Sequence, residues 1–206
     1  MPLQNRVDPF GELFATPARG LFTGNRGGRI HSDDRKLTKR RWASRQWICC
    51  RLQFNDRHRA VWQTGYTELF FLDEVTALSA GHRPCFECRR HDAQAFADFW
   101  ARAKKLRARP RAAEMDRILH PERLDGRSKR KRRMPIDKLP DGAFIELDGR
   151  SWAVRGGALL RWTPSGYDAR KRRPKKTAAD VLTPPAVLRV LSAGYSPKWH
   201  PSADGK

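Results

Sequence analysis

Acidic residues are scarce in this chain, which has 22 Asp and Glu against 43 Lys and Arg. Over 206 residues the formal net charge is +21 with histidine neutral, which is more than solubility requires. Such a surplus is typical of proteins that bind a polyanion, and nucleic acid is the first candidate. A membrane surface is a weaker candidate, because no long amphipathic apolar face accompanies the basic runs. A generally arginine-rich proteome would also produce this composition, without such a partner.

Long apolar runs are lacking too. No stretch approaches the length of a membrane span, and the first 14 residues, MPLQNRVDPFGELF, lack the features of a signal peptide. We therefore expect a cytoplasmic protein that does not bind membranes. In a reducing compartment, its four cysteines are expected to be thiols or metal ligands rather than disulfides.

The apolar pattern predicts an α+β protein: a small antiparallel β meander with helices around a Cys-x-x-Cys turn, plus a second small β-rich lobe. Three strands are predicted in the meander, at residues 47–54, 59–63 and 67–71. Asp73 is expected to cap the helix that follows, and Gly81 to end it. Phe96 and Trp100 share the apolar face of a second helix.

The C-terminal part has its own local signals. Asp148-Gly149 predicts a tight turn between two strands, and Thr183 is expected to cap a short helix with Pro184 in its first turn. Four regions follow from these patterns: an irregular basic N-terminal arm (1–46), a β/helix module that carries the cysteine pair (47–108), a basic connector (109–140) and a β-rich C-terminal lobe with a short helix (141–206).

The motif Cys85-Phe-Glu-Cys88 is the clearest chemical feature of the chain. Two cysteines at this spacing, in a turn that leads into a helix, can present both sulfurs to one metal ion. The positive N-terminus of the helix and the neighbouring arginines would stabilise the thiolates. The pair also occurs in proteins without a metal, so the spacing alone leaves both possibilities open.

The segment FFLDEVTALSAGHRPCFECRR (70–90) resembles the latter half of the zinc-binding domain of Ada-type DNA alkylation-repair proteins. In that family four cysteines hold zinc, and one of them accepts a methyl group from a damaged DNA phosphate. The resemblance covers about a tenth of the chain. It implies that Cys85 and Cys88 are zinc ligands, that Arg83 and Arg89 contact the DNA backbone, and that the function is linked to DNA repair or regulation.

The earlier cysteines depart from that family, which has a Cys-x-x-x-Cys pair where this chain has adjacent Cys49 and Cys50. In a strand these two side chains point to opposite faces. Cys50 shares its face with Ile48 and Leu52, and we expect this face to point inward. Cys50 is therefore the predicted third ligand and Cys49 is expected to be dispensable, although Cys50 can equally be an ordinary core residue.

A histidine is expected to complete the set of ligands. We predict His82 as the fourth ligand, with His58 and His91 as alternatives. Because the counterpart of the family's methyl-accepting cysteine is not recognisable, methyl transfer is not expected.

Basic residues in three groups are predicted to contact phosphates of DNA or RNA. The run at 127–133 is expected to lie in a flexible, solvated basic loop, and a second run, at 170–176, precedes the short C-terminal helix. Trp42 and Trp199, which lie outside the regular patterns, are candidates for stacking on bases. The predicted phosphate contacts are Arg83, Arg89, Arg90, Lys129, Arg130, Lys131, Arg132, Arg133, Arg170, Lys171, Arg172 and Arg173.

Two other functional classes are alternatives. One is an enzyme that acts on nucleic acid, either a metal-dependent nuclease or a thiol-based alkyl acceptor. His31, Asp33 and Asp34 are the candidates for binding a divalent ion in a nuclease. A polar loop is the preferred interpretation of these residues, because no second acidic cluster accompanies them. The other class is a structural or ribosome-associated protein that uses its charge without sequence preference.

Overall fold

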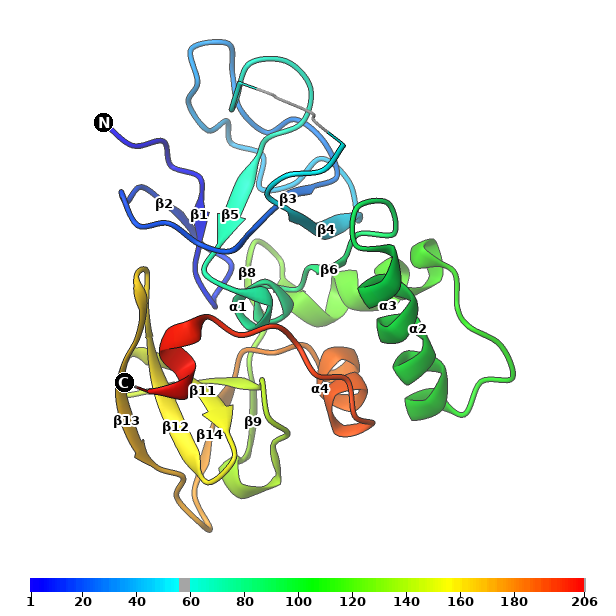
Figure 1. The fold of residues 1–206 in the computed structure, drawn as a ribbon, viewed down its shortest axis with the longest axis vertical. Helices are drawn as coiled ribbons and strands as arrows, with labels where there is room; N and C mark the ends of the chain where they lie inside the picture. Colours follow the sequence, from blue (N-terminus) through cyan, green and yellow to red (C-terminus); the bar gives the residue numbers. More distant parts are fainter. Residues whose placement is uncertain (56–59, 206) are drawn as a thin grey trace.

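The computed structural model describes residues 1–55 and 60–205. Within these residues the fold is α+β, as predicted, with two six-stranded sheets, a two-stranded hairpin and four α-helices (Figure 1). None of the described helices combines the length and the apolar character needed to cross a membrane.

The N-terminal sheet has the strand order β2-β1-β5-β3-β4-β6. Its strands are β1 (Arg6–Val7), β2 (Leu13–Phe14), β3 (Phe22–Arg26), β4 (Trp47–Arg51), β5 (Leu69–Phe71) and β6 (Arg83–Pro84). Residues 1–46, expected to be irregular, thus contribute three strands, and β3 lies between β5 and β4. Gly24 permits this pairing, because a Cβ there would lie 2.0 Å from the Ile48 carbonyl oxygen. The sheet is mixed rather than a meander, since β1 pairs with β5 and β4 with β6 in parallel.

The inward face of β4 is the opposite of the one predicted. Trp47 and Cys49 are buried, whereas Ile48 and Cys50 are half-buried and Leu52 is 52% exposed. The Trp47 ring explains this choice, because the guanidinium groups of Arg26 and Arg123 lie over it at 4.1 and 3.9 Å from the ring centroid. Of the predicted strand at 59–63, residues 60–63 form no strand, and residue 59 lies outside the described residues.

Helices α1 (Glu74–Ser79) and α2 (Arg90–Lys104) match the two helices predicted beside the cysteines. Asp73 caps α1 by accepting a hydrogen bond from the Thr76 amide at 2.8 Å, and Gly81, with φ of +89°, follows the helix. Phe96 and Trp100 are buried on α2, as expected. Residues 86–89 form turns between β6 and α2.

The predicted basic connector is mostly regular structure. It contains α3 (Ala112–Arg123), β7 (Leu124–Asp125), β8 (Ser128–Lys129), β9 (Arg132–Pro135) and the 3-10 turn η1 (Ile136–Lys138). Met115 and Leu119, one helical turn apart, are fully buried against α2 and α4 (Pro185–Ser192), which explains why α3 forms. Of the basic run at 127–133, residues 128–129 lie in β8 and residues 132–133 in β9, while residues 127, 130 and 131 lie in the connections beside them.

The C-terminal sheet has the order β13-β12-β11-β10-β14-β9. Asp148-Gly149 forms the predicted turn, with φ of 52° and 67°. Thr183 does not cap α4: its hydroxyl accepts a hydrogen bond from the Phe144 amide at 2.8 Å, and Pro184 occupies the N-cap. The remaining strands are β10 (Phe144–Leu147), β11 (Arg150–Arg155), β12 (Ala158–Thr163), β13 (Gly166–Arg172) and β14 (Ala178–Val181).

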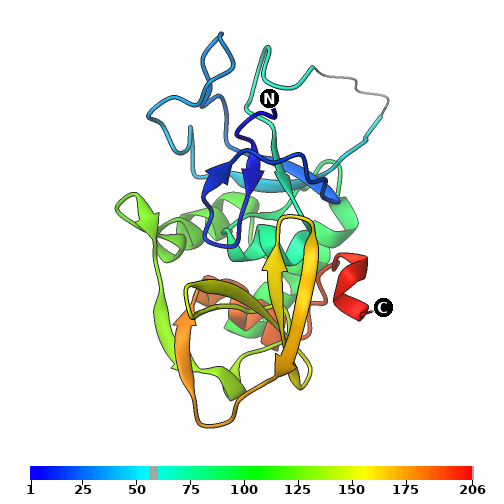
Figure 2. The same cartoon turned by 90° about the vertical axis from the view of Figure 1, so that its left-hand side faces the viewer.

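The two sheets share apolar clusters through the helices between them. Leu72, which precedes α1, and Val75, in its first turn, pack with Phe144 and Ala153 of the C-terminal sheet. Figures 1 and 2 both show α1 between the two sheets. The N-terminal and C-terminal parts of the chain therefore contribute to common cores.

Two acidic residues at the start of α1 hold the C-terminal segments. Asp73 Oδ2 accepts hydrogen bonds from the Tyr167 hydroxyl at 2.8 Å and the His200 amide at 3.1 Å. Glu74 accepts one from the Tyr195 hydroxyl at 2.6 Å, and its other oxygen lies 2.8 Å from Arg89 Nη2. Asp73 and Glu74 are both at most 1% exposed, so these bonds form away from water.

Replacing Glu74 with Gln is expected to destabilise the protein strongly. The change removes one of the carboxylates that face the buried Arg89 guanidinium, and breaking a buried ion pair costs about 3–5 kcal/mol. In a chain of this size that corresponds to a fall of roughly 10 °C in melting temperature, measured by circular dichroism. Asp98→Asn is the control, because its exposed pair with Arg109 is worth at most about 1 kcal/mol. Equal effects of the two substitutions would contradict this role of Glu74.

Candidate metal centre

Three cysteine sulfurs meet beside the N-terminal sheet. Cys50 lies in β4, Cys85 follows β6, and Cys88 precedes α2. Their Sγ atoms all lie within 4.8 Å of one another. Sulfurs around one tetrahedral zinc ion are separated by roughly 3.8 Å, given Zn–S bonds of about 2.3 Å. The three cysteines can therefore hold a metal ion, and the sequence predicted all three.

Backbone hydrogen bonds position these sulfurs. The Cys85 amide donates to the Cys49 carbonyl at 3.0 Å, continuing the pairing of β4 with β6. The Arg51 amide lies 3.4 Å from Cys88 Sγ, and the Glu87 amide lies 3.4 Å from Cys85 Sγ. Such N–H donors favour the thiolate form that binds metals. Hydrogen bonds from the Cys50 and Cys88 thiols also lower the pKa of Cys85.

Cys49 points away from this centre, as the alternation of a strand requires. It is fully buried in the core, and burial raises the pKa of its thiol. Arg89 Nη1 donates to its sulfur at 3.3 Å. Cys49 is therefore not among the three clustered sulfurs, and its buried contact with Arg89 makes us expect a contribution to folding.

The predicted fourth ligand, His82, does not reach the cluster. Its buried ring packs against Trp47 and Phe71, with centroids 5.1 and 4.7 Å away, on the side of β4 opposite to Cys50. Burial lowers the pKa of His82. His91 is exposed on α2 outside the cluster, and His58 lies outside the described residues. Within residues 1–55 and 60–205, the cluster consists of the three cysteines.

A cavity of about 290 Å³ adjoins the three cysteines. Alternate residues of three neighbouring strands line it, because side chains two positions apart share a face of the sheet. The sequence alternation in β4 indicated that Ile48 and Cys50 share one face. The cavity itself could not be located from the sequence, because its other walls come from segments that only the fold brings together with β4. The lining residues are Thr23, Asn25, Ile48, Cys50, Arg51, Leu52, Phe54, Val61, Tyr66, Glu68, Phe70, Cys85, Glu87 and Cys88.

Arg83 and Arg89, predicted to contact phosphate, are instead buried structural residues. Arg83 is 2% exposed, and its Nε and Nη2 donate to the two carboxylate oxygens of Asp116 at 2.9 and 2.7 Å. Arg89 is 1% exposed and pairs with Glu74 and Asp92. Their guanidinium groups are thus not accessible to the phosphates of DNA or RNA, whereas Arg90 is exposed.

The basic runs at 127–133 and 170–176 also contain both buried or paired residues and exposed ones. Lys129 donates to the Ser79 carbonyl, and burial lowers its pKa to about 7. Arg173 donates to the Ile136 and Leu139 carbonyls. The other half-buried or paired members are Arg130, which bonds to Leu124 and Asp125, Lys131, which pairs with Glu146, and Lys171, which lies over Trp152. Five arginines of these runs are exposed: Arg127, which donates to the Lys39 carbonyl, Arg133, which lies 3.9 Å from Asp180, and Arg132, Arg170 and Arg172.

The residues considered for a divalent ion do not converge. Buried His31 bonds to Thr67 at 2.6 Å, Asp33 pairs with Arg29, and Asp34 pairs with Lys36. The two tryptophans considered for base stacking are half-buried. Trp42 packs beside Trp47 and His120, and Trp199 packs beside Tyr167 under the Arg155 guanidinium.

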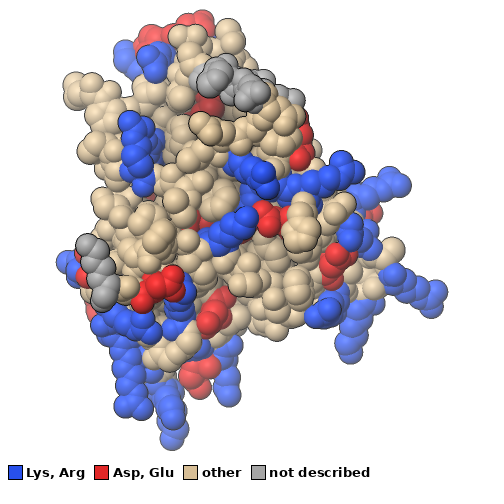
Figure 3. All heavy atoms as spheres, in the orientation of Figure 1, with Lys and Arg blue, Asp and Glu red and all other residues tan. Residues whose placement is uncertain are grey.

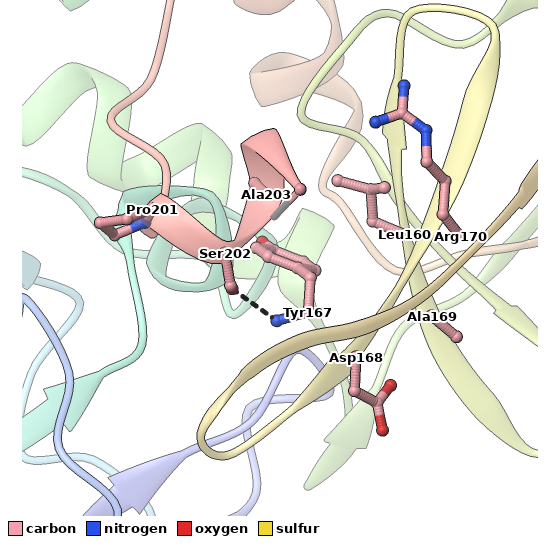
Figure 4. Close-up of a pocket in the computed structure, with 9 residues that line it drawn as sticks. Leu160, Tyr167, Asp168, Ala169, Arg170, Pro201, Ser202 and Ala203 are labelled. Atoms are coloured by element: carbon pink, nitrogen blue, oxygen red, sulfur yellow. Dashed lines mark hydrogen bonds between the residues drawn. The ribbon is translucent and has the colours of Figure 1, made fainter.

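A larger cavity of about 560 Å³ lies on the C-terminal sheet, between β12, β13 and the 3-10 turn η2 (Pro201–Asp204). Figure 4 shows Ser202 beside Tyr167, whose amide donates to the Ser202 hydroxyl at 2.8 Å. Asp168 lines this cavity and pairs with Arg161. The cysteines that could hold a metal do not line this larger cavity. Among the described residues, the smaller cavity beside the cysteines is therefore the better candidate for a functional site.

Comparison of the chain with protein-family models, with curated proteins and with solved structures finds no match.

We expect the purified protein to bind at most one zinc ion per chain, as measured by elemental mass spectrometry. Cys50→Ser, Cys85→Ser and Cys88→Ser should each reduce bound zinc, because each removes one of three ligands. Cys49→Ser should retain zinc but lower the melting temperature, since it changes a buried contact with Arg89. Zinc content unaffected by Cys85→Ser would exclude a metal centre at these residues.

Proposed function

We propose that the protein binds DNA or RNA through phosphate contacts and holds one zinc ion at the three-cysteine centre. The observation that carries the first part is the position of the exposed arginines. Arg132 and Arg133 lie in β9, and Arg170 and Arg172 lie in β13, at the two edges of the C-terminal sheet. Figure 3 shows Lys and Arg side chains projecting from the C-terminal part of the surface.

Zinc is the metal that this ligand set favours. Thiolate ligands in tetrahedral geometry are typical of zinc sites, and zinc requires no redox chemistry. In the protein, Cys50, Cys85 and Cys88 would hold the ion and thereby join β4 to the start of α2, so zinc binding would contribute to stability. A role in DNA repair or regulation rests on the resemblance of residues 70–90 to Ada-type proteins.

Charged residues on edge strands also prevent sheets from pairing with other chains. This protective role is compatible with nucleic-acid binding and requires no polyanion. The two roles differ in their consequence for affinity, because only phosphate binding makes the affinity for DNA or RNA depend on these arginines and on salt.

We expect binding of a fluorescent DNA or RNA duplex to weaken steeply with added salt in an anisotropy titration. Replacing Arg132, Arg133, Arg170 and Arg172 together with Gln should lower affinity at least about tenfold. The slope of log affinity against log salt should fall by roughly 3–4 for DNA, if each arginine neutralises one phosphate.

The control replaces four exposed basic residues elsewhere with Gln: Lys104, Lys105, Arg107 and Arg111. It removes the same charge from the end of α2 and the start of α3. Similar losses in both variants would show that net charge alone drives binding, and salt-independent binding would contradict the proposed phosphate contacts.

A thiol-based alkyl acceptor is the second candidate function. Cys50 is half-buried and lines the cavity, whereas the other three cysteines are buried. This activity would add one methyl group per chain after incubation with DNA that carries methylated phosphates, and Cys50→Ser would abolish the addition. Intact-protein mass spectrometry distinguishes it from nucleic-acid binding without reaction.

A further inference from the structure

The cavity beside the cysteine centre contains a buried carboxylate with an unsatisfied oxygen. Glu68 is 7% exposed, and its Oε2 accepts a hydrogen bond from the Trp62 amide at 3.0 Å. Oε1 is buried without a hydrogen-bond partner among the described residues. A buried carboxylate oxygen is stabilised by a donor, and most strongly by a cationic one.

The strand register places this carboxylate in the cavity rather than in the core. Glu68 and Phe70 face the cavity, while Leu69 and Phe71, which alternate with them, are buried in the core. Across the sheet, β3 pairs with both β5 and β4, so Glu68 and Cys50 lie on one face two strands apart. The carboxylate and the sulfur cluster therefore lie on the same cavity without being adjacent.

Among the described residues, the buried charged group that lines this cavity is the carboxylate of Glu68, although the protein carries +21. Glu87 and Arg51 also line it, and both are exposed. A metal held by three thiolates would add to the negative charge, because three thiolates exceed the charge of one divalent cation. An anionic phosphate would be disfavoured here, so this cavity differs electrostatically from the arginines on the C-terminal sheet.

The other walls are aromatic and apolar. Phe54, Tyr66 and Phe70 line the cavity together with Ile48 and aliphatic neighbours. The faces of aromatic rings attract organic cations, and sites of this kind recognise ammonium groups. The volume of about 290 Å³ is at the small end of the range for ligand sites.

We propose that this cavity binds a small organic amine, with its ammonium group donating to Glu68 Oε1 and its apolar body against the aromatic walls. The site is separate from the phosphate-binding surface of the proposed function. It does not require the ligand to coordinate the metal.

Three probes of nearly the same shape but different charge test the proposal: benzylamine, benzyl alcohol and benzoate. Each is titrated into zinc-loaded, ¹⁵N-labelled protein, and the Trp62 amide and indole signals are followed, because Trp62 donates to the Glu68 side chain and backbone carbonyl. We expect saturable shifts with benzylamine, affinity for benzyl alcohol weaker by at least about tenfold, and no saturable shift with benzoate.

Glu68→Gln should reduce the affinity for benzylamine to that for benzyl alcohol, because the neutral amide retains the shape but loses the charge. Glu87→Gln removes the same charge from an exposed residue of the cavity and should change the affinity less than threefold. Equal binding of the three probes, stronger binding of benzoate, or benzylamine binding unaffected by Glu68→Gln would overturn the proposal. The probe comparison on the unmodified protein stands even if the Glu68 variant does not fold. Nucleic-acid affinity measured with and without benzylamine should be unchanged, so each proposal can fail separately.

Discussion

The buried ion pair between Glu74 and Arg89 is the interaction on which the arrangement of the two sheets most depends. Glu74 begins α1, and Arg89 precedes α2 beside the cysteine centre. The Glu74 carboxylate also accepts the Tyr195 hydroxyl and the Lys198 amide, so one buried charge orients two helices and the C-terminal segment. Burying such charges is unfavourable unless they are paired and hydrogen-bonded, and this requirement restricts the relative positions of all these elements.

The same network explains why the two faces of β4 have different surroundings. Arg89 donates to the Cys49 sulfur on the core side, which commits that cysteine to packing. The alternation of the strand then places Cys50 on the cavity side, where it meets Cys85 and Cys88. The three-cysteine cluster and the cavity thus lie on the outer face of a sheet whose inner face is fixed by Trp47, Cys49 and the buried guanidinium groups.

Charge is sorted by burial across the molecule. The arginines beside the cysteines, Arg83 and Arg89, pair with Asp116, Glu74 and Asp92 in the interior. The edge strands of the C-terminal sheet carry four of the exposed arginines: Arg132, Arg133, Arg170 and Arg172. The cavity beside the cysteines is lined by the three sulfurs, two acidic residues, three aromatic rings and aliphatic side chains, with one arginine among its described lining residues. A strongly basic chain therefore presents two surfaces of different chemistry, and net charge alone describes only one of them.

The sequence by itself determined the features that depend on near neighbours: the Asp73 cap, the end of α1 at Gly81, the Asp148-Gly149 turn, and the proximity of Cys85 and Cys88. It also identified Cys50, but from the wrong face: the prediction placed Cys50 on the inward face of β4, whereas the structure places it on the outer face, beside Cys85 and Cys88. Only the tertiary structure decided which face of β4 is buried, that β3 enters the sheet, and that Arg83 is neutralised by Asp116, 33 residues away. Burial and pairing depend on residues that the fold brings together over long separations, and a local pattern carries no information about them.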